Sequence, residues 1–145
     1  MTQPRSAKAI TTPAEMRELS EVECLELLKT EPVGRLVFTE KALPAIRPVN
    51  YVLDGRDVII RTSGDSWARR VADTVVAFEV DSIDHASHTG WSVVLLGTAT
   101  VITDVNTLVR VTDFRNRPWA PGQRDRYLRI RAGQLTGRRL SFASS

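Results

Sequence analysis

The segment 61–66 places an arginine, hydroxyl side chains and a glycine within six residues, directly after an apolar stretch. A bound phosphate needs converging donors: a guanidinium, hydroxyl groups and free backbone N–H groups at a turn or helix start. Four side chains of the segment supply such donors: Arg61, Thr62, Ser63 and Ser66. The carboxylate of Asp65 would repel a phosphate. The segment is therefore a candidate phosphate site, and a polar turn with an incidental arginine is the alternative.

Other reactive residue types give no comparable pattern. His85 and His88 are three residues apart, but no third ligand is close in sequence, so exposed loop histidines are favoured and no metal site is predicted. Cys24 falls on the apolar stripe of a predicted helix, which favours a buried structural thiol over a nucleophile. The chain has no Gly-x-Ser-x-Gly elbow and no Gly-x-Gly-x-x-Gly loop. No catalytic residue is assigned.

The elements that must position these residues begin with a helix. Ser20 and Glu23 form a Ser-x-x-Glu capping box, and the apolar stripe that follows predicts a helix to about Lys29. Pro32 ends it. After Pro32 the apolar residues alternate, which is typical of strands, and Asp54-Gly55 is a strong hairpin turn.

The alternating stretches predict six or seven strands, at 34–39, 44–53, 57–62, 74–80, 90–103, 127–131 and 135–142. A turn is expected at 40–41, a polar loop at 81–89 and an irregular loop at 117–122. The turn residues 63–66 are expected to cap a short helix that runs through Arg70 or Val71, and a further helix is expected at 105–115. Closely spaced strands with few helices predict a mainly β fold, a β-barrel with a few short helices.

Composition narrows the class of protein. The 145 residues suit one domain, and we expect a flexible polar leader at 1–13 followed by a single domain at 14–145. No apolar run approaches the roughly 20 residues of a membrane span, and no secretory signal is read. The net charge of +3 comes without blocks of like charge, which argues against nucleic acid. One cysteine agrees with a reducing compartment, so a cytoplasmic protein is expected.

Taken together, the chain resembles the pyridoxamine 5'-phosphate oxidase-like family, the FMN-binding split barrels, in its small actinobacterial-type branch. The resemblance runs from Ser20 to about Leu140 and rests on segments in a fixed order. These segments are 19–24, Val33-Gly34-Arg35-Leu36, Pro48-Val49-Asn50-Tyr51, Arg61-Thr62, 77–81, 89–93, Arg117-Pro118-Trp119, Ile130-Arg131 and 136–139.

The resemblance implies a split barrel and a homodimer with two cofactor sites at the subunit interface. It implies that Pro48, Val49, Asn50 and Tyr51 lie along the flavin ring, partly through backbone groups. Arg61, Thr62 and Ser63 would hold the phosphate, with Ser66 beside them, and Trp91 would contribute from near or across the interface. Trp91 and Trp119 are candidate walls for the ring, with a core or dimer-contact role as the alternative.

One position departs from the family pattern. Relatives commonly carry a lysine just after the phosphate-binding turn, where this chain has Trp67. Arg69 or Arg70 would then supply the charge. The function expected is a flavin (FMN)-binding oxidoreductase acting on an unidentified small molecule. The alternatives are a reductase dependent on the deazaflavin coenzyme F-420 and a non-catalytic cofactor-binding or sensing module. Oxidation of pyridoxamine phosphate itself is disfavoured because no second phosphate site is evident.

Overall fold

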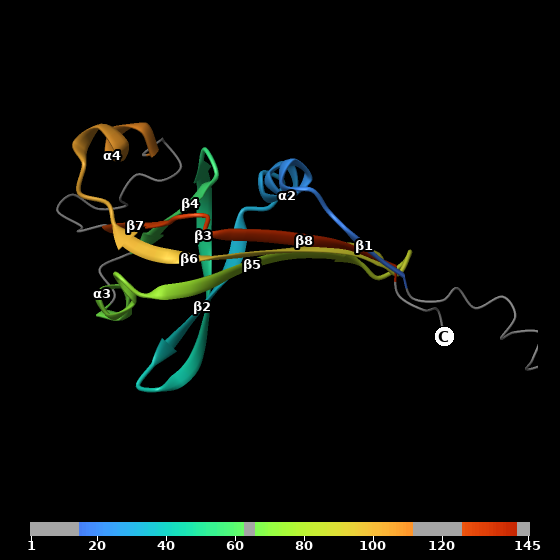
Figure 1. Cartoon of the computed structure of the whole chain (residues 1–145), viewed down its shortest axis with the longest axis horizontal. Coiled ribbons are helices and arrows are strands. Elements are labelled where there is room, and N and C mark those ends of the chain that lie inside the picture. Colours follow the sequence, from blue (N-terminus) through green and yellow to red (C-terminus); the bar gives the residue numbers. More distant parts are fainter. Residues whose placement is uncertain (1–14, 63–65, 112–125, 142–145) are drawn as a thin grey trace, which may run out of the picture.

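The computed structural model describes residues 15–62, 66–111 and 126–141. Over these residues the fold is mainly β, with three short helices (Figure 1). The elements in chain order are β1 Glu15–Glu18, α2 Glu21–Leu28, β2 Val33–Glu40, β3 Leu43–Asp54, β4 Asp57–Thr62, α3 Ser66–Val71, β5 Val75–Asp84, β6 Thr89–Val101, α4 Val105–Val111, β7 Arg126–Ile130 and β8 Gln134–Ser141.

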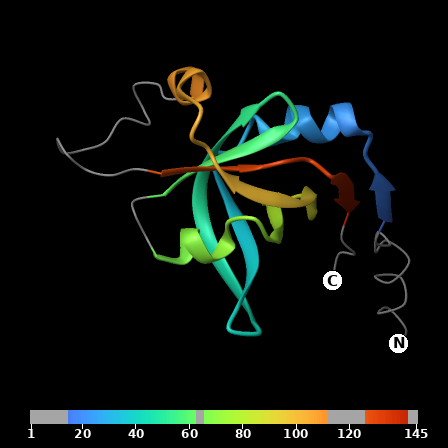
Figure 2. The same cartoon turned by 60° about the vertical axis from the view of Figure 1, so that its left-hand side comes forward.

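Six antiparallel strands close into a barrel in the order β6-β5-β2-β3-β4-β7 and back to β6 (Figure 2). Closure requires β6 to change partner along one edge: its first part, Thr89–Leu96, pairs with β8, and its last part, Ala99–Val101, pairs with β7. Gly97 lies at the change. A Cβ there would stand 1.7 Å from the backbone oxygen of Arg131, so the two backbones approach more closely than any side chain permits.

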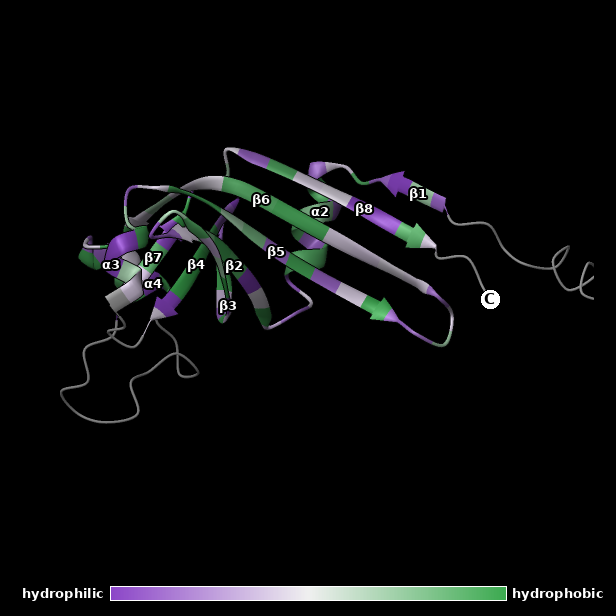
Figure 3. Ribbon diagram, turned by 90° about the horizontal axis from the view of Figure 1, so that it is seen from below, coloured by the Kyte–Doolittle hydropathy of each residue, from purple (hydrophilic) through white to green (hydrophobic). Residues whose placement is uncertain are grey.

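Beyond the barrel the sheet continues as an arm made of β5, β6, β8 and β1 (Figures 1 and 3). β2 pairs with β5 only across Arg35–Val37, so the second half of β5 leaves the barrel together with the first half of β6. Helix α2 packs on β8 and β6. The contact is close: a Cβ on Gly137 would stand only 2.5 Å from the Cys24 sulfur, so the absence of a side chain at Gly137 allows the helix to approach.

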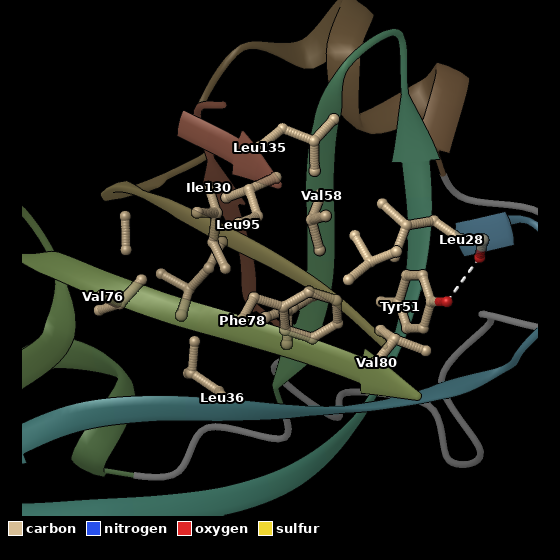
Figure 4. Close-up of a cluster of buried hydrophobic side chains, with 14 of the residues drawn as sticks. Leu28, Leu36, Tyr51, Val58, Val76, Phe78, Val80, Leu95, Ile130 and Leu135 are labelled. Atoms are coloured by element: carbon tan, nitrogen blue, oxygen red, sulfur yellow. Dashed lines mark hydrogen bonds between the residues drawn. The ribbon is translucent and has the colours of Figure 1, made fainter. Parts of the chain in front are cut away.

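The core fills the barrel with side chains that alternate along the strands (Figure 4). Phe78 and Leu36 are fully buried there, and Tyr51 meets the Phe78 ring edge-on with centroids 4.9 Å apart. The Tyr51 hydroxyl donates a 2.5 Å hydrogen bond to the backbone oxygen of Leu28, which ties the end of α2 to the barrel. A second, smaller cluster of Ile59, Val111 and Tyr127 lies under α4 on the outside of β4.

Most of the expected elements are confirmed. The capping box has both of its hydrogen bonds, α2 ends at Leu28, and α3 ends at Val71. The hairpin turn after β3 is shifted by one residue: Asp54 still pairs with Asp57, and Gly55 and Arg56 form the turn. Residues 117–122 and the expected helix residues beyond Val111 lie outside the described part of the chain.

One expectation was wrong, and one strand was not predicted. Residues 81–84 were expected in a loop, but they extend β5, and only 85–88 connect it to β6. A strand accommodates the polar Asp81 because its side chain lies on the outer face and forms an ion pair with Arg35. Polarity at this position therefore did not indicate a loop. β1 was not foreseen, because its four residues are charged or exposed and gain strand structure only by pairing with β8.

Candidate functional site

The residues expected to lie along a flavin ring divide between the two faces of β3. Pro48 and Asn50 are exposed on the outside of the barrel, while Val49 packs against the core. Tyr51 is buried, with its ring on Phe78 and its hydroxyl on Leu28. Tyr51 and Val49 can therefore offer a ligand on the outer face only their backbone groups, because successive side chains of a strand point to opposite faces.

The strand register brings Arg61 to the same outer face. Tyr51 pairs with Ile60, so the next residues along this antiparallel pair, Asn50 and Arg61, are neighbours across β3 and β4. Ile60 belongs to the barrel core, and Arg61 therefore points outward, half-buried and opposite Tyr127 on β7. Pro48, Asn50 and Arg61 thus share one surface although Arg61 is 11 residues from Asn50 in sequence.

Thr62 takes a different position from the one expected of a phosphate ligand. Its side chain is only 3% exposed, and its hydroxyl donates a 3.2 Å hydrogen bond to the backbone oxygen of Arg126. The side chain therefore joins β4 to β7, and a ligand would meet only its backbone. Ser63 and the side chain of Ser66 lie outside the described part of the structure.

Helix α3 explains what Trp67 does in place of a lysine. Trp67 is 7% exposed and stacks on Phe38, with ring centroids 5.5 Å apart and planes 18° from parallel. The guanidinium of Arg47 lies 6.0 Å from the centre of the Trp67 ring. Arg70 forms an ion pair with Glu40 at the end of β2. Trp67 and Arg70 thus anchor α3 to β2, and Arg69, which is exposed, is the helix arginine that remains for a ligand.

Trp91 lies in the arm, away from this surface. It is 8% exposed, belongs to the main core cluster, and pairs across the sheet with Ser82 and Arg139. Within one chain the structure does not bring Trp91 together with Pro48, Asn50 and Arg61. Trp119, the other candidate wall, lies outside the described residues.

The outer face also carries a charged cluster that the sequence patterns did not reveal. Arg35 on β2 pairs directly with Pro48 on one side and with Glu79 of β5 on the other. Its guanidinium lies 3.0 Å from a carboxylate oxygen of Glu79 and 3.1 Å from one of Asp81. Burial, with the neighbouring Asp81 carboxylate as the second cause, raises the pKa of Glu79 to about 7, although Arg35 acts to lower it.

A second charged network fixes the turn between β3 and β4. Arg129 of β7 donates to Asp54 and to Asp57, each at 2.7 Å, and Arg110 of α4 donates twice to Asp54. Hydrogen bonds from Arg110 and then Arg129 lower the pKa of Asp54 to about 2. This network holds α4 against the barrel and lies at the end of β4 opposite to Arg61.

The remaining reactive groups offer little chemistry. Cys24 is fully buried, and burial raises the pKa of its thiol, so it behaves as the structural residue that its helical stripe indicated. Among the described residues no group of three or more His, Cys, Asp or Glu side chains could hold a metal ion. In the same part of the chain, no helix has the length and apolar character needed to cross a membrane.

The fold and the outer surface define a class: a split β-barrel of the type known from flavin-binding proteins. The sequence model of the pyridoxamine 5'-phosphate oxidase family matches residues 20–139, so the chain belongs to that family. An uncharacterized protein of Mycobacterium tuberculosis is 38% identical over 149 residues, covering 94% of this chain and 90% of that protein.

Two solved structures are similar over most of their length. An FAD-binding protein from Mycobacterium smegmatis is 33% identical with a TM-score of 0.77, covering 87% of this chain and 99% of that one. A conserved protein of unknown function from Corynebacterium diphtheriae is 34% identical with a TM-score of 0.72, covering 85% and 96%. The family expected from the sequence motifs is therefore confirmed.

Proposed function

We propose that this chain binds a flavin nucleotide on the outer face of β3 and β4 and works as an oxidoreductase on a small molecule. The observation that carries the proposal is the register that places Pro48, Asn50 and Arg61 on one surface. That surface combines an exposed strand face, which an aromatic ring could cover, with a half-buried guanidinium for a phosphate.

The donor set fits such a ligand. Asn50 offers both donor and acceptor groups to the polar edge of a ring, and the backbone of Val49 and Tyr51 adds further polar groups beneath it. Arg61 and Arg69 would hold the phosphate, together with Ser63 and Ser66, which lie between them in the sequence. A bound flavin supplies the electron-transfer chemistry, and the protein binds it, orients it and sets its electrostatic surroundings.

FMN is the proposed cofactor, and FAD is the second candidate because a relative 33% identical to this chain is an FAD-binding protein. Both contain the same ring and first phosphate, which are the parts that β3, β4 and α3 would recognise. A deazaflavin would use the same face, with its own phosphate on Arg61.

We further propose a homodimer with the cofactor sites at the subunit interface. Large apolar side chains are exposed on the outer face of the barrel strands, among them Val33, Ile46, Val75 and Leu96. Ile46, Val37, Ala77 and Leu96 form one continuous row across β3, β2, β5 and β6. Such a face is typical of an obligate homodimer interface, which buries about 2,000 Å² or more. A cytoplasmic location, where Cys24 stays reduced, is part of the proposal.

The test is the absorbance spectrum of protein purified without added cofactor, followed by titration of stripped protein with FMN, FAD and coenzyme F-420. We expect an oxidised-flavin spectrum and tighter binding of a flavin than of the deazaflavin. Loaded protein that no chemical or enzymatic reductant can reduce would support a sensing module instead. Failure of all three ligands to bind a folded protein would overturn the proposal. Sedimentation at micromolar concentration tests the dimer, and a folded monomer would contradict it.

A further inference from the structure

The charged cluster on the outer face contains one cation and two anions. Arg35 bridges Glu79 and Asp81 at 3.0 and 3.1 Å, and its own side chain remains 54% exposed. With both carboxylates ionised the three side chains carry a net charge of −1. The cluster therefore favours either a proton or a second donor, and Arg35 is long and exposed enough to turn to another acceptor.

The residues directly beside the cluster are uncharged, so the charges that act on the protonation of Glu79 are mainly those of Arg35 and Asp81. Pro48 of β3 lies on the far side of Arg35, and Val94 of β6 pairs with Glu79; neither is charged. Asp81 pairs with Ser92 of β6, which pairs in turn with Arg138 of β8. Arg138 is thus two strands from Asp81, and Glu18 of β1 pairs with Arg138 one strand further on. Among the described residues, these two side chains, of opposite charge, are the further charged groups in the row of Asp81.

The proposed ring site reaches this cluster. Neighbouring strands lie about 4.8 Å apart, and a flavin has three fused rings, so a ring lying on the outer face of β3 also covers an adjacent strand. On the β2 side the residues it meets are Val33, opposite Asn50, and Arg35, opposite Pro48. The pyrimidine end of a flavin ring carries carbonyl oxygens, which are acceptors that a guanidinium fork fits well.

Building on the proposed function, we propose that Arg35 is a ring-contacting residue of the flavin site, and that Glu79 takes up a proton when Arg35 turns from its carboxylate to the ring. Two observations support this: Arg35 lies beside Pro48, and it is held by two carboxylates where one would balance its charge. The sequence motifs did not assign Arg35 to the site.

The proposal sets the sign of a pH effect. The pKa of Glu79 is raised to about 7, mainly by burial and then by Asp81, while Arg35 holds it down. A ligand that draws Arg35 away and covers Glu79 removes the lowering effect and adds burial, so the pKa rises further in the complex. Binding then takes up a proton. Affinity is greatest below pH 7 and falls as the pH rises through the pKa of the free protein toward that of the complex.

The experiment is a titration of the full chain with FMN between pH 7 and 9, where the phosphate, with a second pKa of about 6, no longer changes charge. If the pKa of Glu79 rises by one unit on binding, FMN should bind about fivefold more weakly at pH 9 than at pH 7. Calorimetry at pH 7.5 in two buffers of different ionisation enthalpy should show proton uptake in the wild type.

Variants separate the two residues. Glu79→Gln, which keeps a neutral side chain at every pH, should abolish the pH dependence and the proton uptake while preserving FMN binding. Arg35→Gln should weaken FMN about 10-fold or more at pH 7, with Arg35→Lys in between. The matched control is Arg56→Gln, an exposed arginine paired with Glu21 in the turn before β4. Thermal melting checks that each variant is folded.

Two failures can be told apart. A folded wild-type chain that binds no flavin at any pH refutes the proposed function itself. A wild type that binds FMN, with Arg35→Gln equal to Arg56→Gln and an unchanged pH dependence in Glu79→Gln, refutes only the role of Arg35 and Glu79.

Discussion

Replacing Arg61 with alanine tests the phosphate end of the proposed site. Arg61 is half-buried on the outer face of β4, next to Asn50, so a phosphate held there is partly shielded from water. A hydrogen bond to a charged group contributes about 1.5–3 kcal/mol, which corresponds to roughly 10- to 150-fold in affinity. Because one face of Arg61 remains open to solvent, we expect the lower half of that range for FMN.

The assay compares FMN with riboflavin, which has the same ring and lacks the phosphate. Arg61→Ala should weaken FMN by about 10- to 40-fold and change riboflavin binding less than threefold. Arg56→Ala is the control, because Arg56 precedes the same strand, about five residues or 17 Å away at its other end. Quenching of flavin fluorescence gives the dissociation constants, and circular dichroism gives the melting temperature of each variant.

Equal losses for FMN and riboflavin would place Arg61 at the ring or in the fold and would refute the phosphate assignment. Loss of folding in Arg61→Ala would show that its contacts within the chain dominate. In that event Arg61→Gln, which keeps a polar side chain of similar length, repeats the comparison, and an unchanged ratio of FMN to riboflavin affinity would again refute the reasoning.

Three further predictions concern the framework. Gly97→Ala should lower the melting temperature by about 6–12 °C, the effect of roughly 3 kcal/mol, because its Cβ would meet the Arg131 oxygen at 1.7 Å, whereas Thr98→Ala on the exposed side should cost little. The Asp54 carboxylate has a pKa of about 3.9 in the unfolded chain and about 2 in the folded protein, so it stabilises the fold fully at pH values above about 3.9. This contribution is lost as the pH falls through about 2. Melting curves between pH 2 and 6 should therefore show a smaller acid loss in Asp54→Asn than in the wild type. Deleting residues 1–13, which are polar and lack periodic apolar side chains, should leave the melting temperature within about 2 °C.

Local patterns in the sequence were sufficient for most elements. The Ser20–Glu23 capping box involves residues three apart, and it was found because both partners lie in one turn of helix. The alternation along β2 likewise follows directly from burial of one strand face. β4 is instead apolar on both faces, because Ile59 is buried in the second cluster on its outer side. The family motifs added the closure of these strands into a split barrel, which alternation alone could not distinguish from a sandwich.

What the sequence did not reveal depends on contacts between distant residues. Arg35 meets Glu79 and Asp81 from 44 and 46 positions away, and no local pattern indicates that pairing. The orientation of Trp67 was equally hidden. In a six-residue helix either face could have been buried, and only Phe38 on another strand decides that the indole points inward. A lysine in the place of Trp67 would start from the buried side of α3, so its charge would not reach the outer face.

The double pairing of β6 explains why the proposed ring site and the charged cluster share one surface. β6 pairs with β7 in the barrel and with β8 in the arm, and β5 pairs with the other edge of β6 from Thr89 to Thr98, beside the whole stretch that pairs with β8. Glu79 and Asp81 lie on β5 where it passes from the barrel to the arm, beside the short stretch that pairs with β2. A ligand on β3 that draws Arg35 away would therefore change the charge at the base of the arm. Occupancy of the site should then be felt in the arm first, and hydrogen exchange of β5 amides 79–83 with and without FMN measures this directly. Protection confined to β3 and β4 would show that the ring stops short of β2.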